Sequence, residues 1–321
     1  MRKIPALVTV LGLASLTLVG CASVGAPGCS LPAQAGSDLQ SQVTVSGAPG
    51  SDPSVSIGAP LHVEKGHTWE LAAGSGTPLT GDDQLFSLDF FVYDGTTGER
   101  TYASQGDAST TITLGQWLQV FPGSEGLLTC ATPGSRVVLT LPPEGIEPQA
   151  GATLGLGSGD SAVVVVDVAA AYLTRATGAL VFNDAHGMPT VVRAPDGQPG
   201  IIVPDAAPPA DIRVQTLVRG DGEVLEDDDT ALVNYTGVPW ESRAKVFDTT
   251  WGASPAGVTV ANAQLPGFTE ALKGQTVGSQ VLVVVPADQV PAEGAGSAPA
   301  GKTLVYVIDV LGVAPEAATT R

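Results

Sequence analysis

The chain has 321 residues, enough for about two domains of ordinary size. Its 32 acidic and 14 basic side chains give a formal charge of −18, which argues against a nucleic-acid-binding protein because such proteins need basic surfaces. Hydrophobic residues make up 43 % and charged residues 14 %, so the composition excludes an intrinsically disordered chain. Glycine and proline account for about a fifth of the residues, which is typical of strands joined by turns.

The first twenty residues have the features of a targeting segment. A short basic start precedes an apolar run, Ile4–Gly20, that is too short for a lasting membrane span. The run ends in Leu18–Cys21 (LVGC), which resembles the lipobox of bacterial lipoproteins, where the cysteine is acylated and the chain is cut before it. Residues 1–20 are therefore predicted to be a lipoprotein signal peptide. The alternative is an ordinary secretory signal in which Cys21 has no special role.

A chain anchored through Cys21 has its folded part outside the cytoplasm, attached to the membrane by lipid. No later segment reaches eighteen uninterrupted apolar residues. The extracytoplasmic compartment is oxidising, and Cys29 and Cys130 are the two cysteines left for pairing. We predict a disulfide between them. Two free thiols remain the alternative, because the sequence does not give the distance between their Cα atoms.

The rest of the chain contains an internal repeat. Thr132–Val138 recurs 144 positions later as Thr276–Leu282, and Val163–Val168 matches Tyr306–Val310 near the end of each copy. Two domains of one fold are therefore predicted. The predicted boundaries are 21–39 for a flexible tether, 40–172 for the first domain, 173–213 for an extended linker, 214–313 for the second domain and 314–321 for a tail.

Both domains are predicted to be mainly β-structure. Short runs rich in valine, threonine, leucine and aromatic residues alternate with glycine, proline, aspartate and asparagine. Only Gly267–Lys273, and its counterpart near Gly123, has the size and flanking residues of a short helix. Around Val214–Val218 the linker is predicted to supply the first strand of the second domain.

The second copy resembles an FKBP-type peptidyl-prolyl cis-trans isomerase domain. No single motif in it is specific, but five motifs follow one another in family order and at family spacing across about a hundred residues. The motifs are Asn234–Gly237 (NYTG), Lys245–Thr250 (KVFDTT), Gln264–Phe268 (QLPGF), Gly274–Ser279 (GQTVGS) and Thr303–Tyr306 (TLVY).

The resemblance implies an α+β fold, in which each domain is an antiparallel sheet of about five strands wrapped around one short helix. It also implies a reaction that needs no nucleophile, metal or cofactor. An X-Pro bond isomerises against a barrier of roughly 20 kcal/mol that comes from amide resonance. The twisted amide is less polar than the planar one, so a dry aromatic pocket binds the twisted form preferentially.

The resemblance assigns the site residues one by one. The implied site consists of Tyr235, Phe247, Val258 and Tyr306 as walls, Phe268 as floor, Gln264 and Leu265 beside a substrate carbonyl, and Asp248 as the carboxylate that orients Tyr235. For each aromatic residue taken alone, packing in an ordinary core is the alternative explanation. Asp248 fits that alternative poorly, because a carboxylate buried without a partner costs free energy.

Two departures from the family pattern predict a weakened pocket. The family often has a tyrosine after its proline-rich loop that donates a hydrogen bond to the substrate, whereas Pro286–Ala292 has none and Pro291 stands near that position. The later loop, Gly294–Gly301, is short and lacks a bulky isoleucine.

The first copy is predicted to be a degenerate, non-catalytic domain. Aligned by the repeat, it has Ser124 against Phe268 and Thr101–Ala103 against Val246–Asp248, and only Tyr93 matches a site aromatic, Tyr235.

The expected function is isomerisation of proline-containing polypeptides that are exported from the cell, by a lipid-anchored monomer that binds no nucleic acid. The main alternative is a non-catalytic FKBP-like lipoprotein that only binds or chaperones its partners. A substrate-binding lipoprotein of a transporter is less consistent with the sequence, because such a protein needs a larger two-lobed α/β chain.

Overall fold

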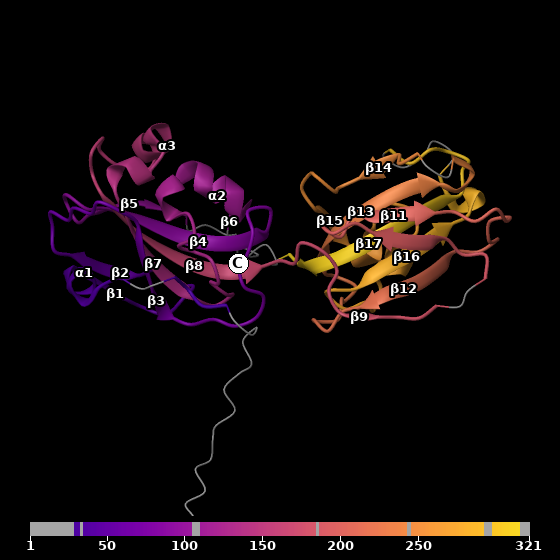
Figure 1. Ribbon diagram of the computed structural model, residues 1–321, viewed down its shortest axis with the longest axis horizontal. Coiled ribbons are helices and arrows are strands. Elements are labelled where there is room, and N and C mark those ends of the chain that lie inside the picture. Colours follow the sequence, from indigo (N-terminus) through magenta and orange to yellow (C-terminus); the bar gives the residue numbers. More distant parts are fainter. Residues whose placement is uncertain are drawn as a thin grey trace, which may run out of the picture.

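The computed structural model describes residues 29–32, 35–104, 110–183, 186–242, 245–291 and 297–314. These residues form two sheet-rich domains that lie side by side, an N-terminal one in indigo to magenta and a C-terminal one in orange to yellow (Figure 1). The predicted signal peptide, Cys21 and residues 315–321 of the predicted tail lie outside the described residues. Two domains built on antiparallel sheets are what the sequence predicts, although each sheet has more strands than expected.

The N-terminal sheet has six strands, all paired antiparallel, in the order β3–β7–β8–β4–β5, with β6 on the first half of β4. The strands are β3 (His67–Ala72), β4 (Leu85–Asp94), β5 (Arg100–Ala103), β6 (Thr110–Thr113), β7 (Arg136–Leu141) and β8 (Ala162–Ala171). The longest pairing is between β4 and β8, which places these two strands at the centre of the domain.

The C-terminal sheet has seven strands in the order β9–β12–β16–β17–β13–β14, with β15 on the first half of β13. The strands are β9 (Ala179–Leu180), β12 (Arg213–Arg219), β13 (Thr230–Pro239), β14 (Asp248–Thr249), β15 (Ala256–Thr259), β16 (Gln280–Val285) and β17 (Leu304–Val313). β12 begins where Val214–Val218 predicts a first strand. Apart from β9, each strand has a counterpart in the other sheet, so the repeat is visible in the topology.

Helices are more numerous than the sequence predicts. The α-helices are α1 (Ser37–Gln42), α2 (Leu114–Val120), α3 (Pro148–Thr153) and α4 (Phe268–Leu272), and the 3₁₀ turns are η1 (Pro122–Ser124), η2 (Pro143–Gly145), η3 (Trp240–Ser242), η4 (Val260–Asn262) and η5 (Ala287–Gln289). The α4 helix confirms the prediction over Gly267–Lys273, whereas its counterpart near Gly123 is only the turn η1. The α2 helix begins at a capping box, in which Thr113 and Gln116 each accept a hydrogen bond from the other's backbone amide.

Each sheet is buried on both faces, which we call the front and the rear. In the N-terminal domain the front core includes Phe86, Trp117 and Leu139, and helices α2 and α3 lie on that side (Figure 1). The rear core includes Phe91 and Val165 and packs against α1 and the hairpin of β1 (Val43–Ser46) and β2 (Ser54–Ile57). The predicted tether therefore ends earlier than residue 39, because Ala35 is buried and α1 belongs to the domain.

The C-terminal domain has a hairpin of its own over its rear face. Strands β10 (Thr190–Arg193) and β11 (Pro199–Ile202) pair with each other, and Val191 and Ile201 pack on the rear core around Leu282. The prediction of an extended linker over residues 173–213 is therefore wrong: this stretch contains β9 and the β10–β11 hairpin. Its physical role is to cover an apolar sheet face that would otherwise meet water.

A buried carboxylate lies at the same place in both central strands. Asp167 on β8 faces Arg136 on β7, and two hydrogen bonds of 2.6 Å join their side chains. The Arg136 guanidinium also donates to the carbonyls of Gly47 and Ser51, which form the turn of the rear hairpin. The ion pair therefore holds the β1–β2 hairpin on the sheet.

In the C-terminal domain, different residues pair with the buried carboxylate. Asp309 on β17 faces Gln280 on β16, whose amide donates to it at 2.7 Å. The arginine now comes from the hairpin, since Arg193 donates to the Gln280 side-chain oxygen at 2.8 Å. The backbone amide of Ala176 donates to the second carboxylate oxygen of Asp309 at 2.7 Å, so residue 176 is fixed to the sheet.

The N-terminal segment is tied to the front of its domain. A disulfide joins Cys29 and Cys130, whose Cα atoms are 5.5 Å apart, and Leu31 packs against the front core. The bridge closes a loop with a sequence separation of 101 residues, which restricts the unfolded chain strongly.

Substitution of Asp309 by asparagine changes how the stability depends on pH. Burial raises the pKa of Asp309 above its ordinary value, although the Ala176 amide and Gln280 oppose that shift. The folded state therefore holds more protons than the unfolded state between the ordinary carboxyl pKa, near about 4, and the raised one, so this group's contribution to stability is lost as pH rises through that interval. Asp309→Asn lacks this loss.

Urea unfolding of the full chain at a series of pH values, followed by tryptophan fluorescence, measures the difference. As pH rises, the unfolding free energy of the parent falls relative to that of Asp309→Asn. Asp228→Asn is the control, because Asp228 is exposed in a turn of the same domain. Parallel pH curves for the parent and Asp309→Asn would contradict the prediction.

Candidate functional site

The front face of the C-terminal sheet carries a cluster of aromatic rings. Tyr235 comes from β13, Tyr306 from β17 and Phe268 from the first turn of α4, and all three belong to the buried front core. Phe247, directly before β14, is half-buried and packs against this core. Alternation along the strands explains the arrangement, since Tyr235 and Tyr306 occupy front-facing positions on two neighbouring strands.

The rings meet edge to face. The centroids of Tyr235 and Phe268 are 5.3 Å apart with planes at 88°, and those of Phe268 and Tyr306 are 5.1 Å apart at 83°. Phe247 contacts Tyr306 in the same manner, at 5.6 Å and 78°. Edge-to-face packing of this kind is favourable because the positive ring edge meets the negative ring face. The cluster therefore forms a stiff apolar wall of defined shape.

Gly237 allows two of these rings to approach the sheet. A Cβ atom at this position would lie 2.7 Å from the ring of Phe247 and 2.8 Å from the ring of Tyr306. Any side chain would thus displace one or both rings. The glycine of the Asn234–Gly237 motif is required by this close approach.

Among the described residues, Asp248 is the one acidic residue that forms a hydrogen bond with the aromatic cluster. The hydroxyl of Tyr235 donates to its Oδ2 atom at 2.8 Å, and the hydroxyl of Ser297 donates to the same oxygen. The side chain is only half-buried, so the carboxylate lies at the edge of the apolar wall. Ser297 is a residue that the sequence analysis missed, because a serine in a glycine-rich loop has no distinguishing pattern.

Both tyrosines of the cluster remain protonated at neutral pH. Burial is the main cause that raises the pKa of the Tyr235 hydroxyl well above its ordinary value, and the hydrogen bond to Asp248 raises it further. Burial also raises the pKa of Tyr306, helped by the charges of Tyr235 and Asp248. The Tyr306 hydroxyl is buried and has no hydrogen-bond partner among the described residues.

The structure brings most of the predicted site residues together. Val258 belongs to the same buried core, and Leu265, three residues before the start of α4, packs against it. Gln264 is the exception, since its side chain is exposed and donates to the carbonyl of Asn262 at 3.4 Å. Part of the predicted short loop, residues 294–296, lies outside the described residues, as does Ala292.

Strand register corrects the alignment of the first copy. Asp89 faces Asp167 as Asn234 faces Asp309, so the counterpart of Tyr235 is Phe90 and not Tyr93. Tyr93 points to the rear core, where its hydroxyl donates to the carbonyl of Pro53 at 3.3 Å. The prediction that Tyr93 matches Tyr235 is wrong because bulges and turns of different length change the offset between the copies.

The first copy keeps an aromatic cluster with different members. Phe90 meets Trp117 at 5.4 Å and 89°, which closely repeats the contact of Tyr235 with Phe268. Trp117 comes from α2, and its indole N–H donates to Ser124, the residue aligned with Phe268, at 2.9 Å. Tyr102, whose ring is 5.2 Å from Phe90, occupies the place of Asp248, so the prediction that aligned it with Phe247 is wrong by one residue. The first domain thus has a floor aromatic but lacks the carboxylate.

The space beside the central strand is filled differently in the first copy. Register places Val92 at the position of Gly237 and Val164 at that of Tyr306. Both valines belong to the front core. The residue before Tyr102 is Thr101 where the second copy has Phe247. The side chain of Val92 therefore occupies the space that Gly237 leaves for two rings.

Comparison with known proteins shows what the C-terminal domain is similar to. Residues 222–311 match the model of the family described as FKBP-type peptidyl-prolyl cis-trans isomerase. An FK506-binding protein of Streptomyces anulatus is 29 % identical over 121 residues, which are 36 % of this chain and 97 % of that protein. A probable FK506-binding protein of Corynebacterium glutamicum is 27 % identical over 115 residues, with the same coverage.

Other similar proteins are larger than the matched domain. The FKBP-type peptidyl-prolyl cis-trans isomerase FkpA of Escherichia coli is 30 % identical over 102 residues, which are 32 % of this chain and 37 % of FkpA. Its crystal structure aligns with a TM-score of 0.30 at 27 % identity, covering 42 % of this chain and 55 % of that one. The three FKBP domains of wheat FKBP73 align with a TM-score of 0.32 at 14 % identity, covering 78 % and 94 %.

Removal of the Tyr306 hydroxyl is expected to stabilise the protein. A buried hydroxyl without a partner costs about 1–3 kcal/mol, so Tyr306→Phe raises the unfolding free energy by about 1 kcal/mol. Tyr235→Phe is the matched control: it removes a hydrogen bond to a carboxylate and lowers the unfolding free energy by about 1.5–3 kcal/mol. Denaturant unfolding of both variants measures the two changes. A loss of stability in Tyr306→Phe would mean that its hydroxyl has a partner.

Proposed function

We propose, from the match of its C-terminal domain to the FKBP-type peptidyl-prolyl cis-trans isomerases, that this protein isomerises X-Pro bonds of exported polypeptides at the outer side of a membrane. The aromatic cluster of Tyr235, Phe247, Phe268 and Tyr306 binds the proline, with Asp248 at its edge. The observation that best supports this proposal is the edge-to-face cluster, with the Asp248 carboxylate at one edge accepting a hydrogen bond from Tyr235.

Isomerisation of an X-Pro bond requires binding of the substrate and no covalent step. Rotation about the X-Pro bond passes through a twisted amide that has lost its resonance and part of its polarity. An apolar wall stabilises that form relative to the planar amide, which prefers water. A rate gain of four decades requires about 5.5 kcal/mol of differential binding, more than one hydrogen bond supplies. Several wall residues therefore act together.

Asp248 contributes by fixing the wall. Its carboxylate holds the Tyr235 hydroxyl, and Tyr235 in turn packs on Phe268 and Tyr306. Loss of the carboxylate frees the Tyr235 ring to move and leaves its hydroxyl without that partner. Ser297 donates a second hydrogen bond to the same carboxylate and helps to hold it in place.

The N-terminal domain is proposed to be non-catalytic. Its front pocket has Val92 in place of Gly237, Val164 in place of Tyr306 and Tyr102 in place of Asp248. The side chain of Val92 takes up space that Gly237 leaves for two rings, and Phe90 has no hydroxyl that a carboxylate could hold.

The location of the protein rests on its N-terminal sequence. A basic start, an apolar run and the tetrapeptide Leu18–Cys21 support lipidation of Cys21. Within the described residues, the structure has no helix that is both long and apolar enough to cross a bilayer. Lipid chains on Cys21 would tether the two domains close to the membrane surface.

Asp248→Ala and Tyr102→Ala form a matched pair of variants that tests the catalytic assignment. The two residues occupy equivalent register positions in the two sheets. In the full chain, Asp248→Ala lowers kcat/KM for a leucine-proline tetrapeptide by about tenfold or more, the value of a hydrogen bond to a charged group. Tyr102→Ala leaves kcat/KM unchanged, and Phe268→Ala lowers it like Asp248→Ala.

The double variant with Asp248→Ala and Phe268→Ala reports on the first domain. No activity above the uncatalysed rate is expected in it. Full activity in the double variant would place catalysis in the N-terminal domain, and an inactive parent chain would favour a protein that binds proline segments without turning them over.

Cys21→Ser tests the membrane anchor. In a bacterial host that processes lipoproteins, the parent chain partitions into the membrane fraction, and the variant appears in the soluble extracytoplasmic fraction. Mass spectrometry of the parent shows an acylated cysteine at its new N-terminus. A soluble parent, cut at another bond, would show that Cys21 belongs to an ordinary secretory signal.

A further inference from the structure

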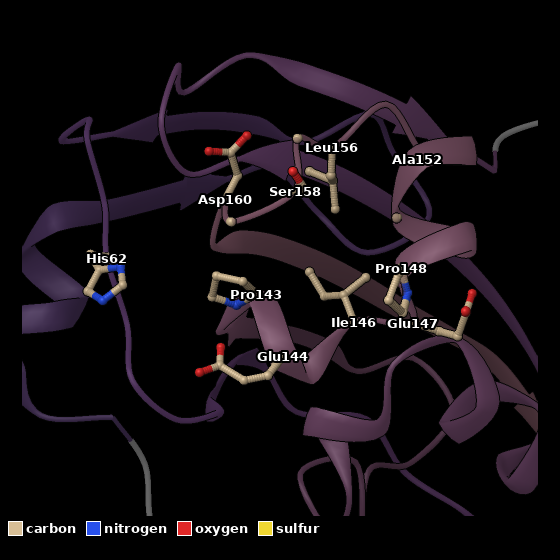
Figure 2. A pocket seen from close by; sticks show the side chains of 13 residues that line it. His62, Pro143, Glu144, Ile146, Glu147, Pro148, Ala152, Leu156, Ser158 and Asp160 are labelled. Atoms are coloured by element: carbon tan, nitrogen blue, oxygen red, sulfur yellow. The ribbon is translucent and has the colours of Figure 1, made fainter.

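A cavity of about 550 Å³ lies in the N-terminal domain, and none of the rings of the aromatic cluster is among its described lining residues. It is formed mainly by the connection between β7 and β8, which includes η2, α3 and residues 156–160, and His62 closes one side (Figure 2). The residues that form it differ from those of the aromatic cluster in the C-terminal domain. It is a second concave surface in the same chain.

The base of the cavity is apolar. Ile146 and Leu156 point toward each other across it and are buried in the front core, and Pro143 and Pro148 lie beside them (Figure 2). Gly151 keeps it deep, because a Cβ atom there would lie 3.3 Å from the Ile146 side chain. Proline and core side chains hold the base in one shape, so little conformational entropy is lost when it is filled.

The rim of the cavity is acidic. Glu144, Glu147 and Asp160 stand around it, and its described lining contains no lysine or arginine. Two of these carboxylates are fixed by the fold: Glu147 accepts the Ala150 amide at the start of α3 at 2.6 Å, and Asp160 accepts the Thr96 hydroxyl at 2.6 Å. Their charges therefore stay at the rim of an apolar hollow.

The counterpart connection in the C-terminal domain is built differently. Between β16 and β17 the described residues include the turn η5 but no α-helix in the place of α3. Val290 and Ala298 of this connection pack into the front core. The cavity is therefore a feature that the first copy has and the second does not show in its described part.

We propose that this cavity binds an extended segment of the client polypeptide in which apolar side chains adjoin a lysine or arginine. The proposal rests on the proposed function, since an isomerase of exported proteins meets chains that are not yet folded. The volume lies within the range of about 300–1,000 Å³ that is usual for ligand sites. Apolar side chains fill the base, and the cationic group pairs with the acidic rim.

The acidic rim also makes an anionic lipid headgroup a poor occupant, because like charges repel. A client held here stays attached while its X-Pro bonds visit the C-terminal domain. Two sites on one chain raise the effective concentration of the client at the second site. The first domain, although it has lost the proline pocket, thereby contributes to the reaction.

Ala152→Trp and Thr153→Trp are a matched pair of variants for the test. Both residues are exposed on α3, but only Ala152 lines the cavity, so a tryptophan at 152 fills it and one at 153 does not. The probe is a labelled octapeptide without proline, with two central leucines flanked by one lysine on each side among glycines and serines. A second peptide has glutamate in place of each lysine.

Fluorescence anisotropy with the full chain measures binding. The lysine peptide binds the parent and Thr153→Trp equally, Ala152→Trp raises its Kd by about tenfold or more, and the glutamate peptide binds at least about tenfold more weakly than the lysine peptide. Glu144→Gln weakens the lysine peptide at low salt, and the effect shrinks at high salt. Isomerase activity on the tetrapeptide is unchanged in Ala152→Trp.

Three results would overturn the proposal: no binding of the lysine peptide to the parent, equal binding to Ala152→Trp, or equal affinity for the glutamate peptide. Because the probe contains no proline, its binding is independent of turnover. An inactive parent that still binds the lysine peptide through residue 152 would leave this site in place and refute only the isomerase function.

Discussion

The central strands β8 and β17 are buried on both faces, and this constraint determines how each domain is built. From Ala162 to Val168 and from Leu304 to Gly312, no residue is more than marginally exposed. A sheet of this kind needs a cover on each side, because apolar surface left in water costs about 25 cal/mol per Å². Helices and aromatic rings cover the front, and a β-hairpin covers the rear. The repeating unit is therefore hairpin, sheet and helix together, and the stretch between the domains is the cover of the second sheet.

The same burial explains why one polar pair recurs in two chemical forms. An aspartate in a strand that is closed on both faces must be paired, since an isolated buried charge is strongly unfavourable. In the first copy the arginine belongs to the sheet and reaches out to the hairpin turn. In the second copy Arg193 belongs to the hairpin and reaches in through Gln280. Both arrangements fasten the rear hairpin, so Asp167 and Asp309 couple the two layers of their domains.

The motifs predicted residues that the structure brings together in the C-terminal domain, because Tyr235, Asp248 and Phe268 each stand in a short segment with a recognisable pattern. What the sequence did not reveal depends on register and on space. A one-residue slip reverses the faces of a strand, so the choice between Phe90 and Tyr93 is a choice between front and rear that needs the paired strand. The offset between copies is 144 residues at Arg136 and 145 at Phe90. Trp117 was not predicted because it belongs to α2, whereas its counterpart Phe268 belongs to α4. The β10–β11 hairpin was not predicted because its turns resembled those of a linker.

Gly237 and Val92 show how one position separates the roles of the two domains. Gly237 on β13 leaves room for the rings of Phe247 and Tyr306. On β4, Val92 fills the equivalent space, and its neighbours are the smaller residues Thr101 and Val164. The connection between β7 and β8 also differs from its counterpart between β16 and β17. In the first copy that connection forms α3 and an acidic-rimmed cavity at the end of the sheet. The two domains have sheets of the same topology. The surfaces that these sheets present to a polypeptide differ, because each surface depends on the few residues that border it.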